Sequence, residues 1–506
     1  MKKSILIIMS ALGLGYIGIS WHTGNIIERE FDNNLQSLTE KVNSYQQLFD
    51  ITINKSHYQK NIFSTKVHLT FTLSPKNQSQ KSTLKVFDDD LTIYHGPFPT
   101  AALANGVFTP KFAWIEYEMG KINSPELWKI AGNKPFITGH ASIGYGQYLI
   151  VKLATKAIKL NHSKLEFYIS DVIYNLESGE DRNQLISTLK FDNLTLYKNK
   201  QDAISFEQFI LTAKPNQDQI EYKMNLGNLH INVGTINRFL FDISNIENKG
   251  HYAFNIDEQE IFTIPNIDSI TNIDKIKFTS TYVPPIAINN LNIKQSSKLN
   301  DNLTVDGYFI TNINSITYGN QNLGSGKLDI NYEGIDGEDL GYPIDPIAKQ
   351  KWLFDNFLTP SNRKISLNNL SWHNDEGDIA IRALIEITDD IYKYRNIDKI
   401  KALKWNIDIP IKVLGRIKAQ TNNPIDNNVQ LEEIQSSSRE LFIICHQFLK
   451  DNPLFTFDKN NEKGIYSNID YNLERDKDEV DVNDKKLNKQ DFFNQLIRTM
   501  RLLIVK

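Results

Sequence analysis

Apolar and polar residues alternate along much of the chain. In the clearest run, Phe63–Leu73, Val67, Leu69 and Phe71 are separated by single polar residues. Because successive side chains of a strand point to opposite faces, this pattern predicts a strand with one buried face. One-sided alternation is typical of antiparallel sheets. Comparable runs occur at residues 84–94, 165–174, 185–197, 204–213, 219–233, 273–283, 303–318, 327–332, 364–372, 379–387 and 401–409. The chain is therefore predicted to be mainly antiparallel sheet.

A short element recurs within these runs. The element has four residues: Asn, an apolar residue, any residue, and a second apolar residue. It begins at Asn193, Asn228, Asn290 and Asn369. Asn tolerates a left-handed backbone, so each copy can bend or bulge its strand at the same relative point. The spacings are irregular, which argues against a solenoid of fixed period. The pattern predicts a long sheet whose strands bend alike.

Helical periodicity appears at both ends of the chain. Residues 24–49 carry apolar side chains at three- and four-residue intervals and are predicted to form a stalk helix that packs on the following domain. Shorter helices are predicted at 124–130, 347–358, 428–449 and 491–504, the last docking on the protein's own core. Glu474–Lys486 is interpreted as a solvated turn.

The predicted fold class is therefore a β-rich α+β protein with a long bent antiparallel sheet. Its predicted parts are a signal-anchor segment at 1–22, a stalk helix at 23–50, an antiparallel β ectodomain at 51–340, and a helix-containing C-terminal part with further strands at 341–506.

An uncharged apolar run, Ser4–Trp21, follows Lys2 and Lys3. As a helix it would span about 27 Å, close to the hydrocarbon thickness of a bilayer. The two lysines favour the cytoplasmic side, which places the rest of the chain outside the inner membrane. The alternative is a signal peptide cleaved near Gly18-Ile19-Ser20, but the run is longer than the usual apolar region of one. We predict a single-pass anchor in the bacterial inner membrane, with the bulk of the chain in the periplasm.

Composition excludes several classes of function. The formal net charge of −4 on 506 residues gives no electrostatic basis for binding nucleic acid. Cys445 is the only cysteine, so no intramolecular disulfide can form. Its apolar neighbours favour a buried core residue over a reactive thiol.

The search for catalytic motifs finds none. The ten histidines show no H-E-x-x-H pattern, and there is no G-x-S-x-G. Gly324-Ser325-Gly326-Lys327 lacks the first glycine and the hydroxyl residue of a phosphate-binding loop. Asp88-Asp89-Asp90 offers fewer oxygens than calcium usually needs. We predict no metal, no cofactor and no enzymatic activity.

The most unusual pentapeptide is His95-Gly96-Pro97-Phe98-Pro99. Glycine permits backbone conformations that other residues resist, and the prolines fix φ on either side of Phe98. Two interpretations follow. The pentapeptide ends a strand, with Phe98 closing the end of the sheet, or it is a rigid turn that presents His95 and Phe98 to a ligand.

These segments together resemble one bacterial family. The resemblance lies in Trp21-His22-Thr23-Gly24, in residues 95–99, in residues 321–328 (QNLGSGKL), and in residues 370–374 (LSWHN) with Gly377. In this combination the chain resembles the YdgA family, whose activity is unassigned. The family commonly has Tyr where His22 stands here. The resemblance implies a periplasmic protein anchored in the inner membrane, and it supplies no catalytic residues.

Two functional hypotheses remain. The first is a scaffold or interaction protein of the cell envelope whose partner is another envelope protein. The second is a carrier of lipid or another apolar ligand along an open β groove. They differ in whether the apolar face of the strands is covered, because a large exposed apolar area needs a ligand or partner.

Overall fold

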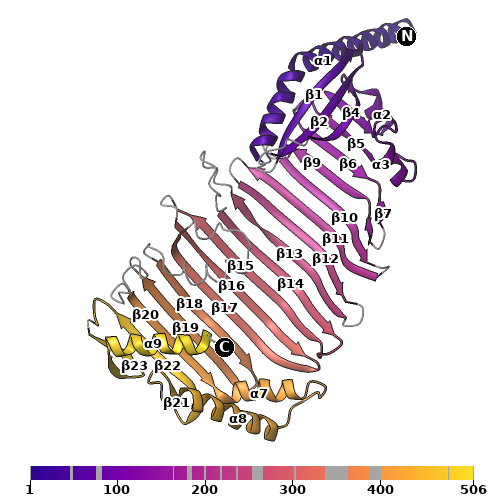
Figure 1. Ribbon diagram of the computed structural model, residues 1–506. Coiled ribbons are helices and arrows are strands. Elements are labelled where there is room, and N and C mark those ends of the chain that lie inside the picture. The colour runs from indigo at the N-terminus through magenta and orange to yellow at the C-terminus, as the bar shows by residue number, and fades with distance from the viewer. Residues whose placement is uncertain are drawn as a thin grey trace. The chain divides into compact units, whose positions relative to one another are not determined.

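The computed structural model (Figure 1) describes residues 2–45, 49–75, 83–162, 165–178, 185–198, 201–216, 219–234, 238–253, 266–300, 304–336, 363–387, 400–476 and 478–504. The described strands are assigned to one antiparallel open sheet, with one long helix at the N-terminus and others near the C-terminus. This confirms the β-rich antiparallel fold. The chain divides into two compact units, Met1–Gln201 with Glu207–Asn216, and Asp202–Phe206 with Gln217–Lys506.

Unit 1 contains α1 (Lys2–Tyr45), β1 (Phe49–Lys60), β2 (Ser64–Pro75), β3 (Leu84–His95), α2 (Thr100–Ala104), β4 (Ala113–Glu118), α3 (Pro125–Ile130), β5 (Ile137–Ile143), β6 (Leu149–Thr155), β7 (Ile158–His162), β8 (Leu165–Ile169), β9 (Val172–Ser178) and β10 (Leu185–Lys198). The strands pair antiparallel in the order β1-β2-β3-β4-β5-β6-β9-β10. β8 continues β9 along the same edge of β10, and β7 pairs with β8. The following strand, β11 (Gln201–Asn216), is divided between the two units.

The core of unit 1 lies between α1 and β2–β4. Val67 and Leu69 of β2 and Ile93 of β3 are buried there. Ile27 and Phe31 of α1, together with Leu35, pack against them. The predicted stalk helix therefore packs on the following strands, as its periodicity indicates.

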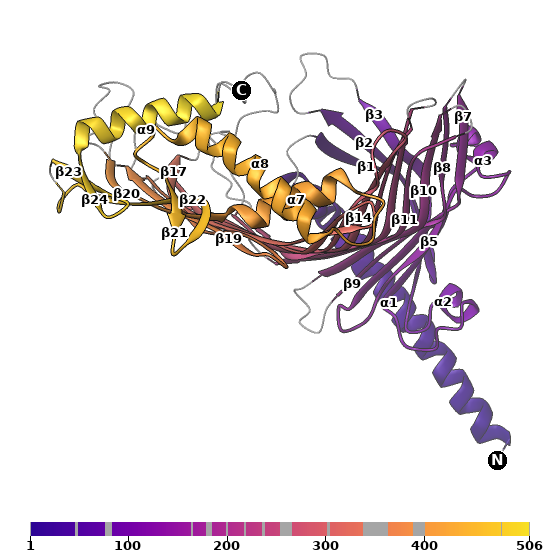
Figure 2. The same cartoon turned by 90° about the horizontal axis from the view of Figure 1, so that it is seen from below.

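Unit 2 contains β12 (Gln219–Val233), β13 (Phe239–Ala253), β14 (Asn266–Ser280), β15 (Ile286–Leu299), β16 (Thr304–Tyr318), β17 (Gln321–Asp336), β18 (Arg363–Asn374), β19 (Gly377–Ile387), β20 (Ile400–Pro410), α7 (Ile411–Asn422), α8 (Leu431–Leu449), β21 (Thr456–Lys459), β22 (Glu462–Asn472), β23 (Glu479–Val482), β24 (Lys485–Asn488) and α9 (Lys489–Ile504). Each strand from β12 to β20 pairs antiparallel with the next one along the chain. The helices lie on one face at the β17–β23 end (Figures 1 and 2).

The core of unit 2 lies beneath α9. Phe492, Phe493 and Leu496 of this helix are buried against the sheet. The predicted docking of the C-terminal helix on the protein's own core is thus confirmed. The prediction of a solvated turn over Glu474–Lys486 is wrong, because β23 lies within it and buries Val480 and Val482 in this core. Alternation over four residues is too short to detect within a run of charges.

The strands of unit 2 share a bend. The β12–β16 registers each skip one position at the same level, at Gly227, Asn245, Asp274, Asn290 and Asn314. Asn245 and Asn290 have φ of 52° and 50°, in the left-handed region. A shared irregularity at one level is therefore present on β12–β16. Of the four recurring Asn residues, however, only Asn290 has positive φ.

Several predictions about helices and burial have a mixed outcome. Leu431, predicted to face the core from α8, is 60% exposed, whereas Ile434 is buried. Cys445 is half-buried rather than buried. The helix predicted at 347–358 lies outside the described residues.

The predicted anchor belongs to α1, and the side chains of residues 1–13 lie outside the described part of the chain. Within the described part of the chain, no helix has both the length and the hydropathy needed to cross a bilayer. The anchor therefore stays a prediction.

Candidate functional site

The pentapeptide at residues 95–99 docks α1 on the sheet of unit 1. The His95 ring is fully buried, and its Nδ1 lies 2.9 Å from the Ser20 carbonyl oxygen of α1. Its Nε2 lies 3.3 Å from Thr65 Oγ1. Because a carbonyl can only accept, Nδ1 carries the proton, and Nε2 accepts from the threonine hydroxyl. His95 therefore joins the helix to β2.

Two glycines permit this close approach. A Cβ at Gly24 would lie 2.6 Å from His95 Cε1. Gly96 has a φ of +115°, and a Cβ there would lie 2.0 Å from Ser20 Oγ. We call Ser20, Gly24, Thr65, His95 and Gly96 the α1 docking cluster. The two family motifs in this half of the chain, at residues 21–24 and 95–99, thus meet at one contact.

The outer part of the pentapeptide reaches the surface. Phe98 is 38% exposed, and its carbonyl oxygen accepts a hydrogen bond of 2.6 Å from the Tyr16 hydroxyl. The ring of Tyr16 stacks on Phe63. The pentapeptide therefore separates the two residues that the sequence analysis grouped, because His95 points into the core and Phe98 points outward.

We expect the stability of unit 1 to fall as the pH decreases below about 6.5. Burial lowers the pKa of His95 from its ordinary value, against the opposing effect of the bond to Ser20. A group with a depressed folded-state pKa stabilises fully above its unfolded pKa, near 6.5, and loses that contribution at lower pH because the unfolded chain takes up the proton. In the His95→Gln variant this part of the pH dependence should disappear. Urea unfolding of both proteins at pH 7.5 and 5.0 checks this, and equal pH dependence would contradict it.

The second pair of family motifs docks α7 in unit 2. The Gln321 side chain is buried and donates to the carbonyl oxygens of Asn423 and Asp426. The indole N–H of Trp372 donates to the Leu323 carbonyl at 3.0 Å, and its ring covers Gly326. Gln420 of α7 donates to the Asn322 carbonyl. Residues 321–328 therefore form the start of a strand on which α7 docks. They do not form a phosphate-binding loop, as their sequence predicts.

The carboxylates of Asp88, Asp89 and Asp90 on β3 do not all face the same partner. Asp88 and Asp90 bond to opposite nitrogens of His68, at 3.0 and 2.7 Å. Asp89 accepts instead from the Gly120 N–H, at 2.7 Å, and from Asn123. Bonds to Lys85, Thr70 and His68 lower the pKa of Asp88 to about 2. Within the part of the chain searched, no group of three potential metal ligands was found.

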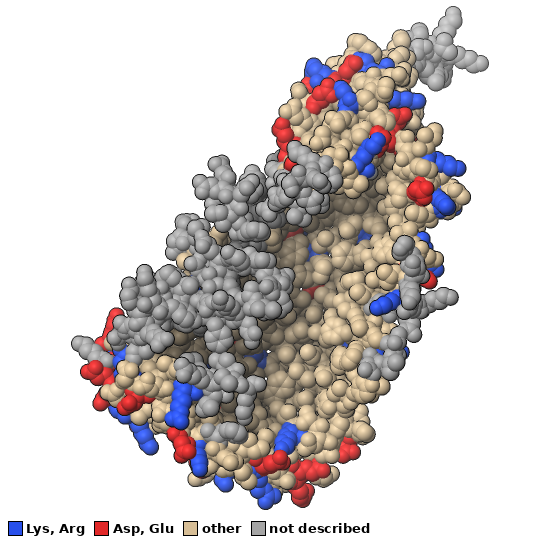
Figure 3. All heavy atoms as spheres, in the orientation of Figure 1, with Lys and Arg blue, Asp and Glu red and all other residues tan. Residues whose placement is uncertain are grey.

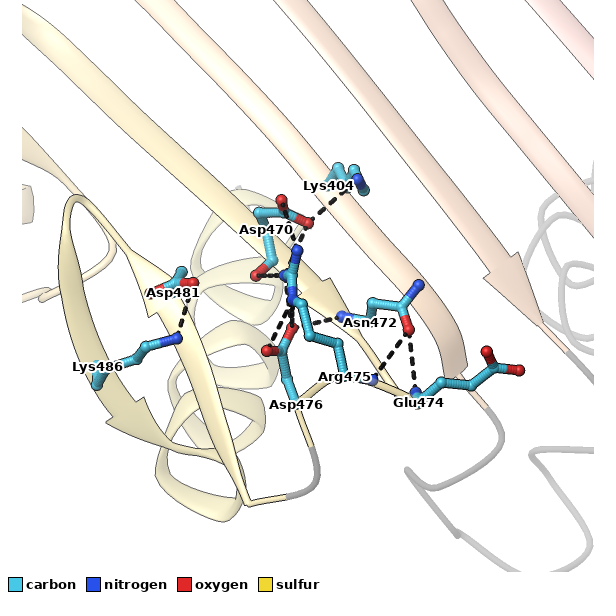
Figure 4. Close-up of polar contacts among 8 residues, drawn as sticks. All are labelled: Lys404, Asp470, Asn472, Glu474, Arg475, Asp476, Asp481 and Lys486. Carbon is cyan, nitrogen blue, oxygen red and sulfur yellow. Dashed lines mark hydrogen bonds and ion pairs between the residues drawn. The ribbon is translucent and has the colours of Figure 1, made fainter.

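A network of charged side chains follows β22 (Figure 4). The Arg475 guanidinium bonds to both carboxylate oxygens of Asp476, at 2.6–3.0 Å. It also reaches Asp470, which pairs with Lys404 at 3.3 Å. The Asp476 carboxylate in turn accepts from the Asn472 N–H. These contacts close the turn between β22 and β23, and they have the geometry of a structural network.

The most extensive feature of unit 2 is an apolar face on β12–β16. Register and alternation place three rows of apolar side chains on one face: Leu226, Ile246, Ile273, Leu291 and Ile313; then Leu229, Ile243, Ile276, Ile288 and Ile316; then Ile231, Phe241, Phe278, Ile286 and Tyr318. We call these fifteen residues the apolar face. Strands spaced about 4.8 Å apart make it roughly 20 Å across.

The side chains of this face are covered only in part. Leu226 is buried, whereas the other fourteen are partly exposed. Figure 1 draws no described helix over β13–β15. In the space-filling view this side of β12–β17 is hollowed, mostly uncharged side chains line the hollow, and charged ones gather at its rim (Figure 3).

The opposite face of the same strands is polar. Lys223 pairs with Glu247 at 3.0 Å, and the Asn292 amide donates to Asn272 at 2.6 Å. His230 pairs with Asp242. The two faces therefore differ as the alternation predicts, but their arrangement into rows was not predicted. A signal was present, because Leu226/Leu229, Ile243/Ile246, Ile273/Ile276, Ile288/Leu291 and Ile313/Ile316 all place two apolar residues three apart across the bend.

The comparisons with known proteins give a family without an activity. The DUF945 family, described as bacterial protein of unknown function, matches residues 1–341. Uncharacterized protein YihF of Escherichia coli (strain K12) is 20% identical over 451 residues, covering 83% of this chain and 85% of YihF. Protein YdgA of the same strain is 21% identical over 461 residues, covering 83% and 84%. No solved structure matches significantly. The resemblance seen in the sequence is thus confirmed, and the chain belongs to the DUF945 family of bacterial proteins of unknown function.

Proposed function

We propose that the protein is a lipid-binding protein that holds hydrocarbon chains on the apolar face of unit 2. The observation that carries the proposal is the three adjacent apolar rows that continue across five strands and stay partly exposed. The rows occupy an area on the order of 300 Å², which is within the size range of the largest apolar patch on a typical monomer, a patch that often has a function.

The C-terminal end of the same sheet face supports this proposal. Leu403 and Trp405 of β20 are covered there by the aromatic and aliphatic side chains of α9. Ile385 of β19 is level with Leu403 and packs in the same cluster. The contacts between α9 and this part of the sheet are thus mainly apolar. The partly exposed rows would suit an occupant of the same chemistry.

The chemistry of the rows favours hydrocarbon over protein. A protein interface carries about one hydrogen bond for each 100–200 Å². The fifteen side chains of the apolar face offer one hydroxyl, that of Tyr318, and no charge. A scaffold would also be expected to have this face covered by its own elements, so the partial exposure favours the carrier hypothesis.

The location proposed with this function is the periplasmic side of the inner membrane. Ser4–Trp21 would anchor the chain, with Lys2 and Lys3 on the cytoplasmic side. α1 would then join the membrane to unit 1, since the α1 docking cluster begins at Ser20. The proposal assigns no chemical reaction to the protein.

Native mass spectrometry of the detergent-extracted full chain tests the proposal. We expect adducts with the masses of phospholipids that persist at activation energies sufficient to remove detergent. Reconstitution with phosphatidylethanolamine should restore the adducts after delipidation. A chain that never retains lipid, before or after this treatment, would contradict the proposal.

A further inference from the structure

At one end of unit 1, part of α1 and three other chain segments form a surface rich in exposed apolar side chains. The segments are 14–27 of α1, 61–65 at the start of β2, 96–112 between β3 and β4, and 141–151, which includes the end of β5, the β5–β6 turn and the start of β6. We call them the aromatic end. Within them large apolar side chains are exposed: Leu14, Ile17, Ile19, Trp21, Ile62, Phe63, Phe98, Leu103, Phe108, Ile143, Tyr145 and Tyr148.

Direct contacts join these segments. The Tyr16 ring stacks on Phe63, and its hydroxyl bonds to the Phe98 carbonyl. The Phe112 N–H donates to the Ile143 carbonyl at 2.7 Å. Phe112 packs edge-on against Tyr145 with ring centroids 5.8 Å apart. The exposed side chains therefore belong to one continuous surface, and Figures 1 and 2 show α2 beside α1 within it.

The aromatic end is almost free of charge. Lys111 is the only Lys, Arg, Asp or Glu in the four segments. The opposite end of the same strands differs, because Lys85, Asp88 and His68 form ion pairs there. The N-terminal part of α1 also extends from the unit at this end (Figures 1 and 2).

We infer that the aromatic end rests on a phospholipid bilayer, with its exposed rings at the headgroup level around the point where α1 enters the membrane. Tyr, Trp and Phe combine an apolar body with tolerance of the interface and gather at this depth in membrane proteins. The inference rests on the proposed anchor, and it is independent of the apolar face of unit 2.

A bilayer explains the observations better than a protein partner. The surface surrounds an apolar helix that points outward, so an occupant must accept the helix and the ring of aromatic side chains together. The lone Lys111 suits anionic headgroups. Phe108, which is 74% exposed, lies in the same segment as the exposed Phe98 and Leu103, so the exposed apolar side chains are grouped here.

Depth-dependent fluorescence quenching tests the inference on the full chain. Cys445→Ser removes the native thiol, and Phe108→Cys supplies a single site for a bimane label. The protein is reconstituted into vesicles of phosphatidylethanolamine and phosphatidylglycerol that carry a nitroxide near the headgroup. The matched control is Ile122→Cys, because Ile122 is equally apolar and 93% exposed but lies beyond the other end of β4. We expect strong quenching at position 108 and at least threefold less at position 122.

A second comparison separates contact from mere proximity to the anchor. Phe98→Glu combined with Leu103→Glu should reduce the quenching at position 108 at least twofold, while flotation with the vesicles stays unchanged. Anchored protein with equal quenching at positions 108 and 122 would overturn the inference alone. A label at 108 shielded from both the lipid nitroxide and aqueous iodide would indicate a protein partner and would also overturn it. Failure to float would contradict the anchor and the inference together.

Discussion

Ile276→Glu is expected to reduce lipid binding by the full chain at least tenfold. Ile276 stands in the middle row of the apolar face, between Ile243 and Ile288 in register. A carboxylate there would have to contact hydrocarbon, and an ionised group in an apolar medium costs several kcal/mol. In the unliganded protein the partly exposed side chain can reach water, so the fold should persist. Titration with a fluorescently labelled phosphatidylethanolamine measures the effect.

Ile270→Glu provides the matched control on the same strand. Ile270 lies on the opposite face of β14, and Lys249 and Lys294 are its partners in register. The new carboxylate would therefore face two cations, and opposite charges across strands stabilise a sheet slightly. We expect wild-type lipid binding in this variant. If both variants bind lipid like the wild type, the apolar face is not the binding site.

Gly24→Ala is expected to destabilise unit 1 by about 1–3 kcal/mol, the usual cost of overpacking a filled site. The added methyl would lie 2.6 Å from the His95 ring. That ring cannot move away without losing its contact with Ser20 or Thr65. Amide hydrogen exchange should show faster exchange along α1 and at Thr65. Thermal unfolding should show a lower Tm.

Gly18→Ala separates this packing effect from helix propensity. Gly18 is on the same helix, and a Cβ there would meet nothing within 4 Å. Alanine is favoured over glycine in a helix by roughly 1 kcal/mol, so this variant should be neutral or more stable. If both alanine variants behave alike, α1 is not held by the docking cluster.

Alternation predicts strands well where the inward face stays apolar along the whole strand. β12 is predicted at residues 219–233 and is observed at Gln219–Val233. β13 and β15 were not predicted. Their inward positions near one end are polar, with Asn248 and Gly250 on β13 and Gln295 on β15. The extra residue at each bend also shifts the phase of the alternation, which hides one half of a strand from the other.

The sites depend on contacts between distant parts of the sequence. His95 and Ser20 are separated by 75 residues, so the sequence indicated a rigid turn at 95–99 but not the helix that it holds. Similarly, an apolar face was predicted for each strand. Whether that face is covered depends on where α9 docks, and periodicity contains no information about this position.

The order of strands in unit 2 determines how the number of strands could differ between related proteins. From β12 to β20 each strand is bonded to its neighbours in the chain, so removing one hairpin would bring two strands of compatible direction together. The bend and the three apolar rows recur on every strand from β12 to β16, so the new junction would still match. Each hairpin gained or lost changes the width of the hollow by about 10 Å. Relatives that differ by pairs of strands would then accommodate hydrocarbon of different extent with the same architecture.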